Sequence, residues 1–218
     1  LCLQELKLAD EAVPRELFES RGYTLAVRGE RQWNGVLIAS KWPLSEVHLA
    51  LPDGDDGHAR FISAVVQGVR LVNLYCPQGQ RVDSPQFPYK LGFYDALLAW
   101  LRVHSGPQEA LVVLGDLNVA RDPEDIWDPE AFADVPSFHP EEHRRWDALL
   151  DFGLVDAVKP HIEPGQFSFW DYRGAAFRFN HGMRIDHLLV TAAVSARLQG
   201  AWIDRDFRKK RAGLTASD

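Results

Sequence analysis

Three short apolar runs that carry a carboxylate at one end constrain this chain more than any other feature. They cover residues 1–5, 111–118 and 184–190, and they supply Glu5, Asp116 and Asp186. Short runs of this kind are typical of buried β-strands. A carboxylate at the point where such a strand meets a loop lies at the rim of a sheet, held rigidly and open to a ligand. Several carboxylates that converge there would bind a hard cation and, through it, a phosphate.

Length and composition indicate one ordinary globular domain. The chain has 218 residues, of which 46% are hydrophobic and 25% charged, so it can bury a full core. It has no apolar stretch near the roughly 20 residues of a membrane span and no signal-peptide pattern, so we expect a cytoplasmic protein without a membrane partner. Cys2 and Cys76 lie in apolar runs, which favours buried free thiols over a disulfide.

The charge balance is only a weak guide to the partner. The formal net charge of −7 does not favour binding to nucleic acid. A metal site, however, concentrates acidic residues that the bound cation then neutralises. Basic residues also gather near the C-terminus, at Arg205, Arg208, Lys209, Lys210 and Arg211. A nucleic-acid partner is therefore compatible with the composition.

The apolar patterns predict several strands. The runs 60–66 and 69–74 flank Gln67 and Gly68, and a two-residue link that contains glycine predicts a β-hairpin. A further strand is expected at 36–39, after Asn34-Gly35. Hairpins mixed with helices favour sheets that pack face to face and are covered by helices.

Two helices are expected between these strands. Apolar residues at i, i+3, i+4 and i+7 predict an amphipathic helix through 94–101. A second helix is expected at 140–151, with Trp146, Leu149 and Leu150 as its buried stripe. The segment 122–140 is rich in proline and acidic residues, and we expect a surface loop with short helical turns.

Each carboxylate also has an ordinary structural explanation. Glu5 alone could be a solvated residue after a strand. Asp116 and Asn118 follow a glycine and could form a side-chain-to-backbone turn. Asp186 and Arg184 would share one face of a strand, so a local ion pair is the simplest interpretation of that pair.

The histidines do not indicate a catalytic or zinc site. His187 would point to the opposite face of the strand from its neighbour Asp186, so the two are not expected to form a catalytic dyad. His139 and His143 have the spacing of a helical zinc pair. No glutamate stands between them in the position of a zincin motif and no third ligand is evident, so we expect solvated residues at a helix start.

Aromatic residues are dense around position 170. They are Phe167, Phe169, Trp170 and Tyr172, with Arg173 and Arg178 close by in the sequence. Core packing explains such a cluster. Aromatic side chains beside arginines can also stack on bases or wedge into a duplex, so both interpretations stay open at this point.

Six motifs in chain order connect these fragments. They are L-Q-E at 3–5, N-L-Y-C-P-Q-G at 73–79, G-D-L-N at 115–118, F-S-F-W-D-Y-R at 167–173, R-I-D at 184–186 and L-T-A-S-D at 214–218. Together they resemble the exonuclease III family, the bacterial AP endonucleases of the endonuclease/exonuclease/phosphatase superfamily. Q-E, G-D-x-N and S-D mark the superfamily, whereas Y-x-P-Q-G and F-S-F-W-D-Y-R are more specific to its DNA-repair branch.

The resemblance implies a fold and an activity. The expected fold is a DNase I-like four-layer α/β sandwich, in which two packed β-sheets are flanked by helices. The expected activity is hydrolysis of DNA phosphodiester bonds at abasic sites and 3′ ends, with Mg²⁺ or Mn²⁺ as cofactor. The partner would be double-stranded DNA, and the protein would be a monomer in the bacterial cytoplasm, at the nucleoid.

The same resemblance implies roles for the polar residues. Glu5 would be the main metal carboxylate, and Asp218 a further acidic group of the metal region. Asp116 would position or deprotonate the attacking water, while Asn118 would help to hold the phosphate and the nucleophile. Tyr75 would donate a hydrogen bond to phosphate oxygens in the transition state, where negative charge gathers.

Further residues are assigned by the resemblance to orientation and to DNA contact. Asp186 would orient a catalytic histidine. Phe169 or Trp170 would lie in the pocket that accepts an abasic sugar, which flips out cheaply because little stacking is lost. The residues expected to contact DNA are Gln78, Arg81, Phe169, Trp170 and Arg173.

The ends of the chain depart from the family pattern. The family begins with a strand that carries a T-W-N motif, followed by a helix, and it continues as S-D-H-x-P-V where this chain stops at Asp218. We therefore expect residues 1–218 to form a single domain that lacks its first strand and helix and its last strand. We also expect these 218 residues alone to be nearly inactive.

Two other functions are compatible with parts of the sequence. One is a superfamily phosphatase or phosphodiesterase acting on inositol phosphates or lipids, and the repair-type motifs at 77–79 and 169–173 argue against it. The other is a catalytically silent DNA-binding fragment. The sequence leaves open the balance of endonuclease, exonuclease and 3′-phosphatase activity.

Overall fold

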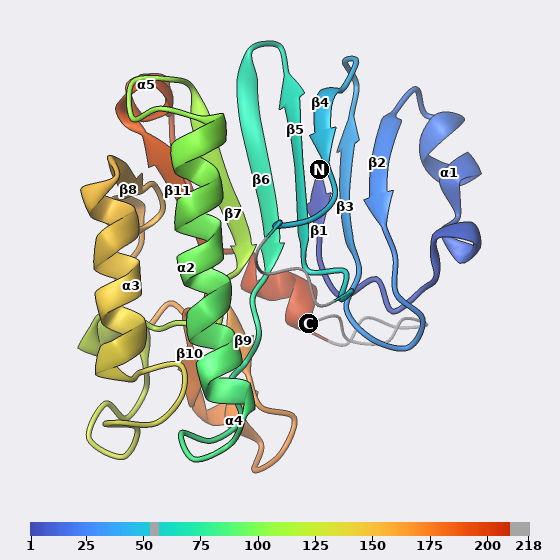
Figure 1. Cartoon of the computed structure of the whole chain (residues 1–218). Helices are drawn as coiled ribbons and strands as arrows, with labels where there is room; N and C mark the ends of the chain where they lie inside the picture. The colour runs from blue at the N-terminus through green and yellow to red at the C-terminus, as the bar shows by residue number, and fades with distance from the viewer. Residues whose placement is uncertain (53–56, 210–218) are drawn as a thin grey trace.

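The structure, a computed structural model, describes residues 1–52 and 57–209. Its strands are β1 (Cys2–Leu3), β2 (Thr24–Arg28), β3 (Val36–Ser40), β4 (Ser45–His48), β5 (Phe61–Val66), β6 (Val69–Tyr75), β7 (Leu111–Asp116), β8 (Leu154–Asp156), β9 (Phe169–Trp170), β10 (Gly182–Met183) and β11 (Asp186–Thr191). Its α-helices are α1 (Arg15–Glu19), α2 (Gln86–His104), α3 (Pro140–Asp151), α4 (Ala176–Phe179) and α5 (Ala192–Ser195). Short 3₁₀ turns cover Asp10–Ala12, Pro123–Asp125, Lys159–His161 and Arg205–Arg208. Figure 1 shows their arrangement.

Two sheets form the centre of the molecule. The larger has six strands in the order β4-β5-β6-β7-β11-β8, and the smaller has three in the order β1-β3-β2. In the larger sheet β6 and β7 are parallel, whereas the other neighbours run antiparallel. A parallel pair needs a long crossover connection, and α2 provides it between β6 and β7. A third sheet pairs β9 with β10 in antiparallel orientation.

The sheets and helices stack in four layers. The core between α2, α3 and the six-stranded sheet includes Phe93, Leu97, Val113, Trp146 and Leu149. The core between the two sheets includes Val36, Ile38, Ile62 and Ala64. On the outer face of the small sheet, Val27, Leu37 and Ala39 pack with Phe18 of α1. The predicted four-layer α/β sandwich is therefore confirmed.

Local sequence explains the elements that were expected. Gln67 and Gly68 both have positive φ, at 48° and 75°, as the predicted hairpin turn requires, and they join β5 to β6 in register. The strand at 36–39 and the helix at 140–151 are also present, and the helix through 94–101 extends over the whole of α2.

One detail of the predicted core is wrong. Trp146 and Leu149 of α3 are buried as expected, but Leu150 is 36% exposed. At 100° per residue, Leu150 lies to the side of the stripe that faces the sheet.

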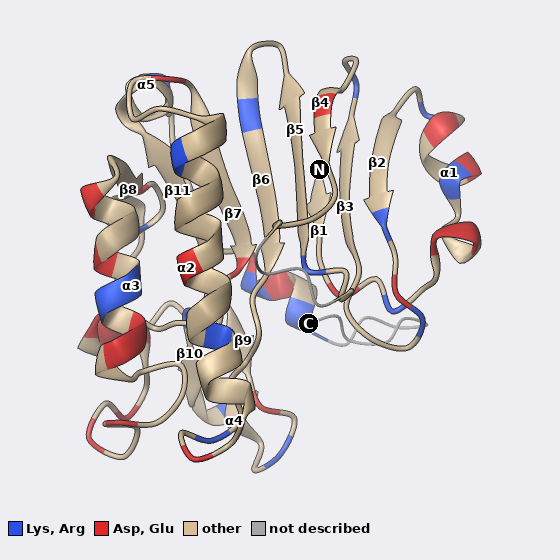
Figure 2. Cartoon of the chain, viewed as in Figure 1, with Lys and Arg blue, Asp and Glu red and all other residues tan. Residues whose placement is uncertain are grey.

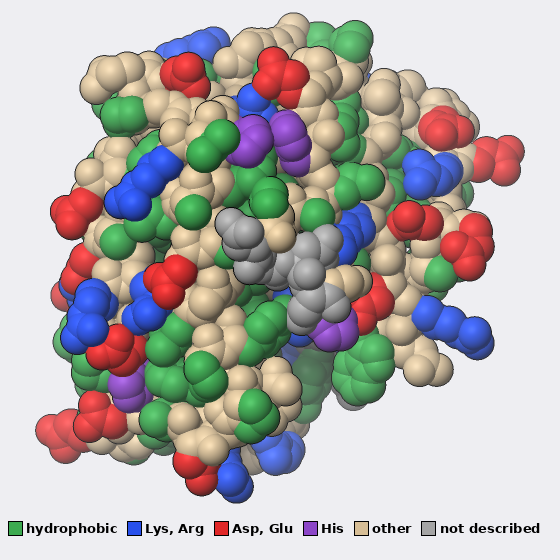
Figure 3. Space-filling model, viewed as in Figure 1, with side chains coloured by type: hydrophobic (Ala, Val, Ile, Leu, Met, Phe, Trp, Pro, Cys, Tyr) green, Lys and Arg blue, Asp and Glu red, His purple; other side chains and the backbone are tan. Residues whose placement is uncertain are grey.

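The outer face of the helical layer is mixed in chemistry. Over α2 and α3, acidic, basic and apolar side chains alternate without a large patch of one sign (Figure 3). Among the described residues, no helix is both long enough and apolar enough to cross a membrane. The distinctive surface of the molecule is instead the edge of the sheet where β6 and β7 end.

Candidate active site

Three polar side chains stand in a row at one edge of the six-stranded sheet. Tyr75 and Asp116 are the last residues of the parallel strands β6 and β7, and Asp186 is the first residue of the antiparallel strand β11. The register pairs Tyr75 with Asp116, and Asp116 with Asp186. Neighbouring strands lie about 4.8 Å apart, so the sheet itself brings these side chains together from distant parts of the chain.

Glycine at position 115 makes this row possible. A Cβ atom at Gly115 would lie 2.1 Å from the carbonyl oxygen of Leu74 on the neighbouring strand, and the residue has a φ of +120°. Both features exclude a side chain. Gly115 therefore lets β7 approach β6 closely immediately before Asp116.

Glu5 comes from the end of the small sheet, and buried Asn73 holds it beside the row of Tyr75, Asp116 and Asp186. Asn73 of β6 is fully buried, and its Nδ2 donates to the carbonyl oxygens of Leu3 at 2.9 Å and Leu37 at 3.0 Å. Its Oδ1 accepts from Nε2 of Gln4 at 2.5 Å. Asn73 thus fastens the end of β1 to the larger sheet, and Glu5 follows directly.

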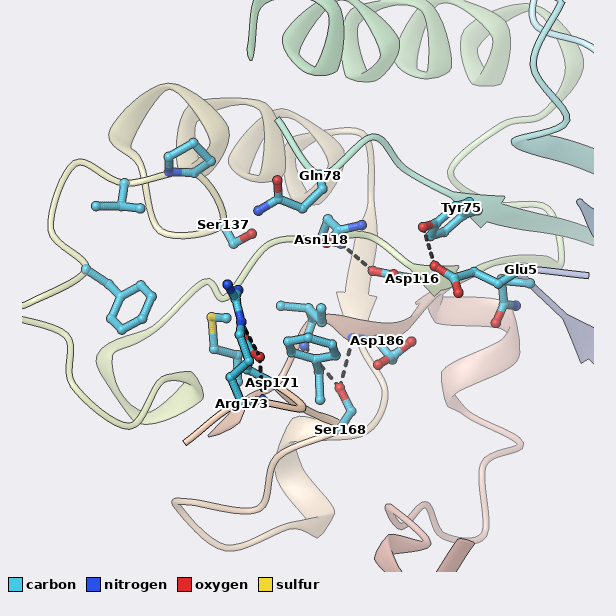
Figure 4. A pocket seen from close by; sticks show the side chains of 17 residues that line it. Glu5, Tyr75, Gln78, Asp116, Asn118, Ser137, Ser168, Asp171, Arg173 and Asp186 are labelled. Carbon is cyan, nitrogen blue, oxygen red and sulfur yellow. Dashed lines mark hydrogen bonds and ion pairs between the residues drawn. The ribbon is translucent and has the colours of Figure 1, made fainter. Parts of the chain in front are cut away.

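Glu5 joins the row through Tyr75. The Tyr75 hydroxyl donates to Oε1 of Glu5 (Figure 4). Nζ of Lys7 lies 2.7 Å from Oε2 of Glu5. Glu5 has a left-handed φ of 53°, which costs a residue other than glycine about 1–2 kcal/mol. Such strain at a residue that faces a cavity is typical of a functional position.

Asn118 is fixed by the turn that follows β7. Its backbone N–H donates to Oδ1 of Asp116 at 2.8 Å, and its side-chain Nδ2 donates to the carbonyl oxygen of Cys76 at 2.8 Å. Asn118 has a φ of 53°, which asparagine tolerates better than most residues. The side-chain turn suggested by the sequence is present, and it places Asn118 beside the row.

A cavity of about 560 Å³ opens over these residues. Its polar side includes Glu5, Tyr75, Asp116, Asn118 and Asp186, and its apolar side includes Phe132, Val135, Phe169, Met183 and Ile185. Gln78, Ser137 and Arg173 lie across the cavity from Glu5 (Figure 4). The pocket can therefore hold a charged group on one side and an apolar ring on the other.

The row is electrostatically unfavourable for its carboxylates. Desolvation raises the pKa of Asp116 well above its ordinary value, and the facing Asp186 adds to the shift. Although Asp186 opens to the cavity, desolvation also raises the pKa of its carboxyl, with a further contribution from Glu5. Desolvation and then Glu5 raise the pKa of Tyr75. For Glu5, desolvation is outweighed by the hydrogen bonds from Lys7 and Tyr75, so its pKa is lowered.

This donor set fits a hard divalent cation. Carboxylates that repel one another inside a cavity are stabilised by an ion between them. Within 1–52 and 57–209, no three or more His, Cys, Asp or Glu side chains form a ready metal cage. A cation such as Mg²⁺ does not need one, because it keeps several waters and binds one or two carboxylates. Glu5, with its lowered pKa, is the carboxylate best suited to hold it.

The predicted DNA contacts separate into two groups. Gln78, Phe169 and Arg173 line the cavity. Arg81 is exposed, pairs with Asp83 at 2.9 Å, and does not line this cavity. Trp170 is 2% exposed, belongs to a buried cluster and does not line the cavity, so its contact with DNA stays a prediction. Asp218 lies outside the described residues.

Arg184 does not pair with Asp186, so the suggested local ion pair is also wrong. Its buried guanidinium instead makes two bonds to Asp125, at 2.8 and 2.9 Å, and one to Asp156 at 2.7 Å. Nδ1 of His187 accepts from Nη1 of Arg184 at 3.0 Å, because the other ring nitrogen donates to a backbone carbonyl. His187 is therefore turned away from Asp186, as expected, and belongs to this buried network.

The two histidines of α3 are less solvated than expected. His139 is the N-cap of the helix, and its Nδ1 accepts from the N–H of Glu141 at 3.1 Å. His143 is half-buried, and its Nε2 donates to the carbonyl oxygen of Ala120 at 2.9 Å. The position at the helix start is confirmed, and the ring of His143 is used to hold a loop.

Sequence reasoning missed several residues that shape the site. Ser168 accepts the backbone N–H groups of Ile185 and Asp186, each at 3.1 Å, and so fixes the start of β11. Asn73 was noted only as part of a motif, and Met183 and Ile185 carry no signal that distinguishes a pocket wall from a core. A polar residue within an apolar strand was the available hint for Asn73.

Comparison with known proteins gives a match over the whole chain. The endonuclease/exonuclease/phosphatase family matches residues 1–218. Exodeoxyribonuclease III of Haemophilus influenzae is 32% identical over 221 residues, which cover 94% of this chain and 82% of the relative.

Solved structures are similar in the same way. A 3′-5′ exonuclease (NExo) from Neisseria meningitidis is 36% identical with a TM-score of 0.91, over 97% of this chain and 83% of that one. A structure described as the Neisseria 3′ phosphatase NExo bound to a product DNA hairpin is 37% identical with a TM-score of 0.85, over 90% and 77%. An AP endonuclease from Archaeoglobus fulgidus is 29% identical with a TM-score of 0.83, over 90% and 77%.

Proposed function

The chain belongs to the endonuclease/exonuclease/phosphatase family, and on this basis we propose that it is a DNA-repair nuclease of the exonuclease III type. It would hydrolyse DNA phosphodiester bonds at abasic sites and at 3′ ends. Relatives named as exodeoxyribonuclease, 3′-5′ exonuclease and AP endonuclease support this activity, and one of them is bound to a DNA hairpin. In this chain, the row of Tyr75, Asp116 and Asp186 beside an apolar wall carries the proposal.

The residues of the row suit hydrolysis of a phosphodiester. The oxygen of a water would bond to phosphorus while the bond from phosphorus to the 3′ oxygen breaks, and that oxygen would take a proton from solvent water and leave as a hydroxyl. Asp116 would accept the proton of the water, since it lies between Tyr75 and Asp186 in the row and beside Asn118. The raised pKa of Tyr75 keeps its phenol protonated, so it remains a donor for the phosphate oxygens.

Asn118 and the cofactor would complete the binding of the phosphate. Asn118 is held beside Asp116 by two hydrogen bonds, so its position is set before the substrate arrives. We infer that Glu5 would hold one divalent cation, Mg²⁺ or Mn²⁺. That ion would neutralise charge on the phosphate oxygens when bound.

The apolar wall favours a deoxyribose without a base. Phe169, Met183 and Ile185 offer a surface against which a sugar can pack, and the polar row lies across the same cavity. A nucleotide that lacks its base leaves the stack at low cost, which would favour its entry. Arg173 at the rim would contact the backbone beside it.

The decisive experiment compares three substrates with the full native chain. These are a duplex with one abasic site, an intact duplex with a recessed 3′ end, and inositol phosphates, each with Mg²⁺ and with chelator. We expect metal-dependent cutting of the two DNA substrates and none of the third. Hydrolysis of inositol phosphates with no action on DNA would contradict the proposal and favour a phosphatase of the same superfamily.

A further inference from the structure

We propose that Lys90 is a positioning residue of this active site, because its buried ammonium group holds the two loops that carry Asn118 and Gln78. The inference rests on the proposed nuclease function and deepens it. Lys90 does not line the cavity and was not singled out by any pattern in the sequence. It would act on the substrate only through the residues that it holds.

Lys90 lies between the helical layer and the site. It belongs to α2 and is fully buried, as is its partner Glu142 of α3, and Nζ lies 2.5 Å from Oε1 of Glu142. Figure 2 shows a basic segment in the first half of α2 beside an acidic segment at the start of α3. The pair therefore bridges the two helices that cover the sheet.

The remaining hydrogen bonds of the ammonium group point to the active site. Nζ donates to the carbonyl oxygen of Asn118 at 2.7 Å and to that of Gln78 at 3.2 Å. The Lys90 ammonium thus makes one ion pair, to Glu142, and two hydrogen bonds, to the carbonyls of Asn118 and Gln78. Asn118 and Gln78 both line the cavity, and they come from the loops after β7 and β6.

The loop after β7 is held by side chains at every carbonyl from 117 to 120. Leu117 accepts from the Tyr94 hydroxyl at 2.5 Å, and Val119 accepts from Nε2 of His187 at 2.7 Å. The carbonyl of Ala120 accepts from a half-buried histidine of α3, as described above. Lys90 is the donor of this set that also reaches Gln78, so it adds a second link between the two loops, beside the bond from Asn118 Nδ2 to the carbonyl of Cys76.

Stability does not explain a charged residue at this position. A buried ion pair can often be replaced by apolar side chains of similar size with no loss of stability. Lys90 and Glu142 are both fully buried. What an apolar residue could not supply is a donor for two carbonyls, and these belong to residues that must be placed accurately for catalysis. A misplacement of about 1 Å can lower a rate about 100-fold.

The test uses a double substitution, Lys90→Met with Glu142→Gln. Lys90→Met alone would leave Glu142 buried and unpaired, whereas glutamine keeps the acceptor that caps α3 at the N–H of His139. We expect single-turnover incision of abasic DNA to fall about 10- to 100-fold, with duplex affinity changed less than about threefold. Amides of residues 116–120 should exchange faster with deuterium, while the interior of β7 stays protected.

Thr191→Val is the matched control. Thr191 is fully buried, donates to the carbonyl oxygen of Glu109 at 2.6 Å and accepts from the N–H of Leu111 at 3.1 Å. The substitution removes buried hydrogen bonds where β7 begins and β11 ends, which is the edge of the sheet opposite the active site. Its melting temperature should fall at least as far as that of the double variant, while incision stays at the wild-type rate.

Several outcomes would overturn the proposal. An unchanged incision rate in the double variant, or equal losses in incision and affinity, would show that Lys90 does not position the catalytic loops. If Thr191→Val loses incision activity in proportion to its drop in melting temperature, a general loss of stability would explain the slower incision of the double variant. If the full native chain without substitutions does not cut DNA, the proposed function fails, and the exchange of amides 116–120 still decides whether Lys90 holds this loop.

Discussion

Replacement of Arg184 by methionine should strongly destabilise the protein. Arg184 and Asp125 are 1% and 2% exposed, and they are joined by two parallel hydrogen bonds at 2.8 and 2.9 Å. Arg184 also binds Asp156 at 2.7 Å. Methionine fills much of the same volume but leaves the Asp125 carboxylate with Lys159 as its cationic partner, at 2.9 Å.

The expected magnitude follows from this burial. Removal of one partner of a buried ion pair costs about 3–5 kcal/mol in the free energy of unfolding. For a domain of this size, each kcal/mol lowers the melting temperature by about 2–4 °C, so Arg184→Met should melt about 6–20 °C lower. The cost comes mainly from the buried Asp125 carboxylate, which loses both bonds to Arg184 and keeps only the contact with Lys159, because the lost packing is small.

The pH dependence of this loss has a definite sign. In the wild-type protein, burial opposes ionisation of Asp125, but hydrogen bonds from Arg184 outweigh it and lower the pKa. This pair therefore contributes stability above the unfolded pKa of about 3.9, and that stability is lost as the pH falls through the folded pKa. Without Arg184, burial should raise the pKa of Asp125. Protonation of Asp125 should then stabilise the variant. The difference in free energy of unfolding between wild type and Arg184→Met should therefore shrink from pH 7 toward pH 4.

Urea unfolding at pH 7 and at pH 4.5 measures this directly. Arg81→Met is the control, since Arg81 and Asp83 form the same two-bonded pair, at 2.9 and 3.1 Å, on the surface. Exposed pairs contribute about 0–1 kcal/mol, so that variant should be nearly as stable as the wild type. The reasoning would be refuted if Arg184→Met loses less than about 1 kcal/mol of unfolding free energy relative to wild type, or if this loss grows toward acid pH.

Three further predictions concern the site. Glu5→Gln should lower incision about 100- to 1,000-fold and raise the Mg²⁺ concentration needed, and full incision at low Mg²⁺ would rule out Glu5 as the metal carboxylate. Asp116→Asn should lower single-turnover incision at least about 100-fold with little change in duplex affinity, whereas parallel losses would indicate a structural role. Phe169→Ala should reduce the preference for abasic over intact duplex with a small change in melting temperature, while Trp170→Ala, at a buried position, should cost about 3–5 kcal/mol in stability. Unchanged discrimination by Phe169→Ala would show that this ring does not select abasic sites.

The fold could be predicted where the information is local. The turn at Gln67-Gly68 and the spacing of apolar residues in 140–151 depend on neighbours in the sequence, and both elements are present. The identity of the two sheets could not be derived in this way, because pairings such as β1 with β3 depend on long-range register. The resemblance to a family supplied that arrangement.

The candidate site shows the same division. Glu5, Asp116 and Asn118 belong to motifs, and they meet as expected. The ion pairs between different elements were not predicted. Arg184 pairs with Asp125 and not with Asp186, and Lys90 pairs with Glu142. A charged residue on a helix is usually solvated, so the sequence offers no sign that two such residues will be buried against each other.

The parallel pairing of β6 and β7 has a consequence for the order of events in folding. β5 and β6 are joined by a two-residue turn and can pair early, but β6 can meet β7 only after α2 has closed a long loop, and β11 must return from farther along the chain. Contacts between distant segments form slowly, because the entropy of loop closure must be overcome first. Tyr75, Asp116 and Asp186 lie on these late pairings. During refolding, the helical signal should therefore recover before catalytic competence, and a chain that has only its local structure should hold no cleavage site.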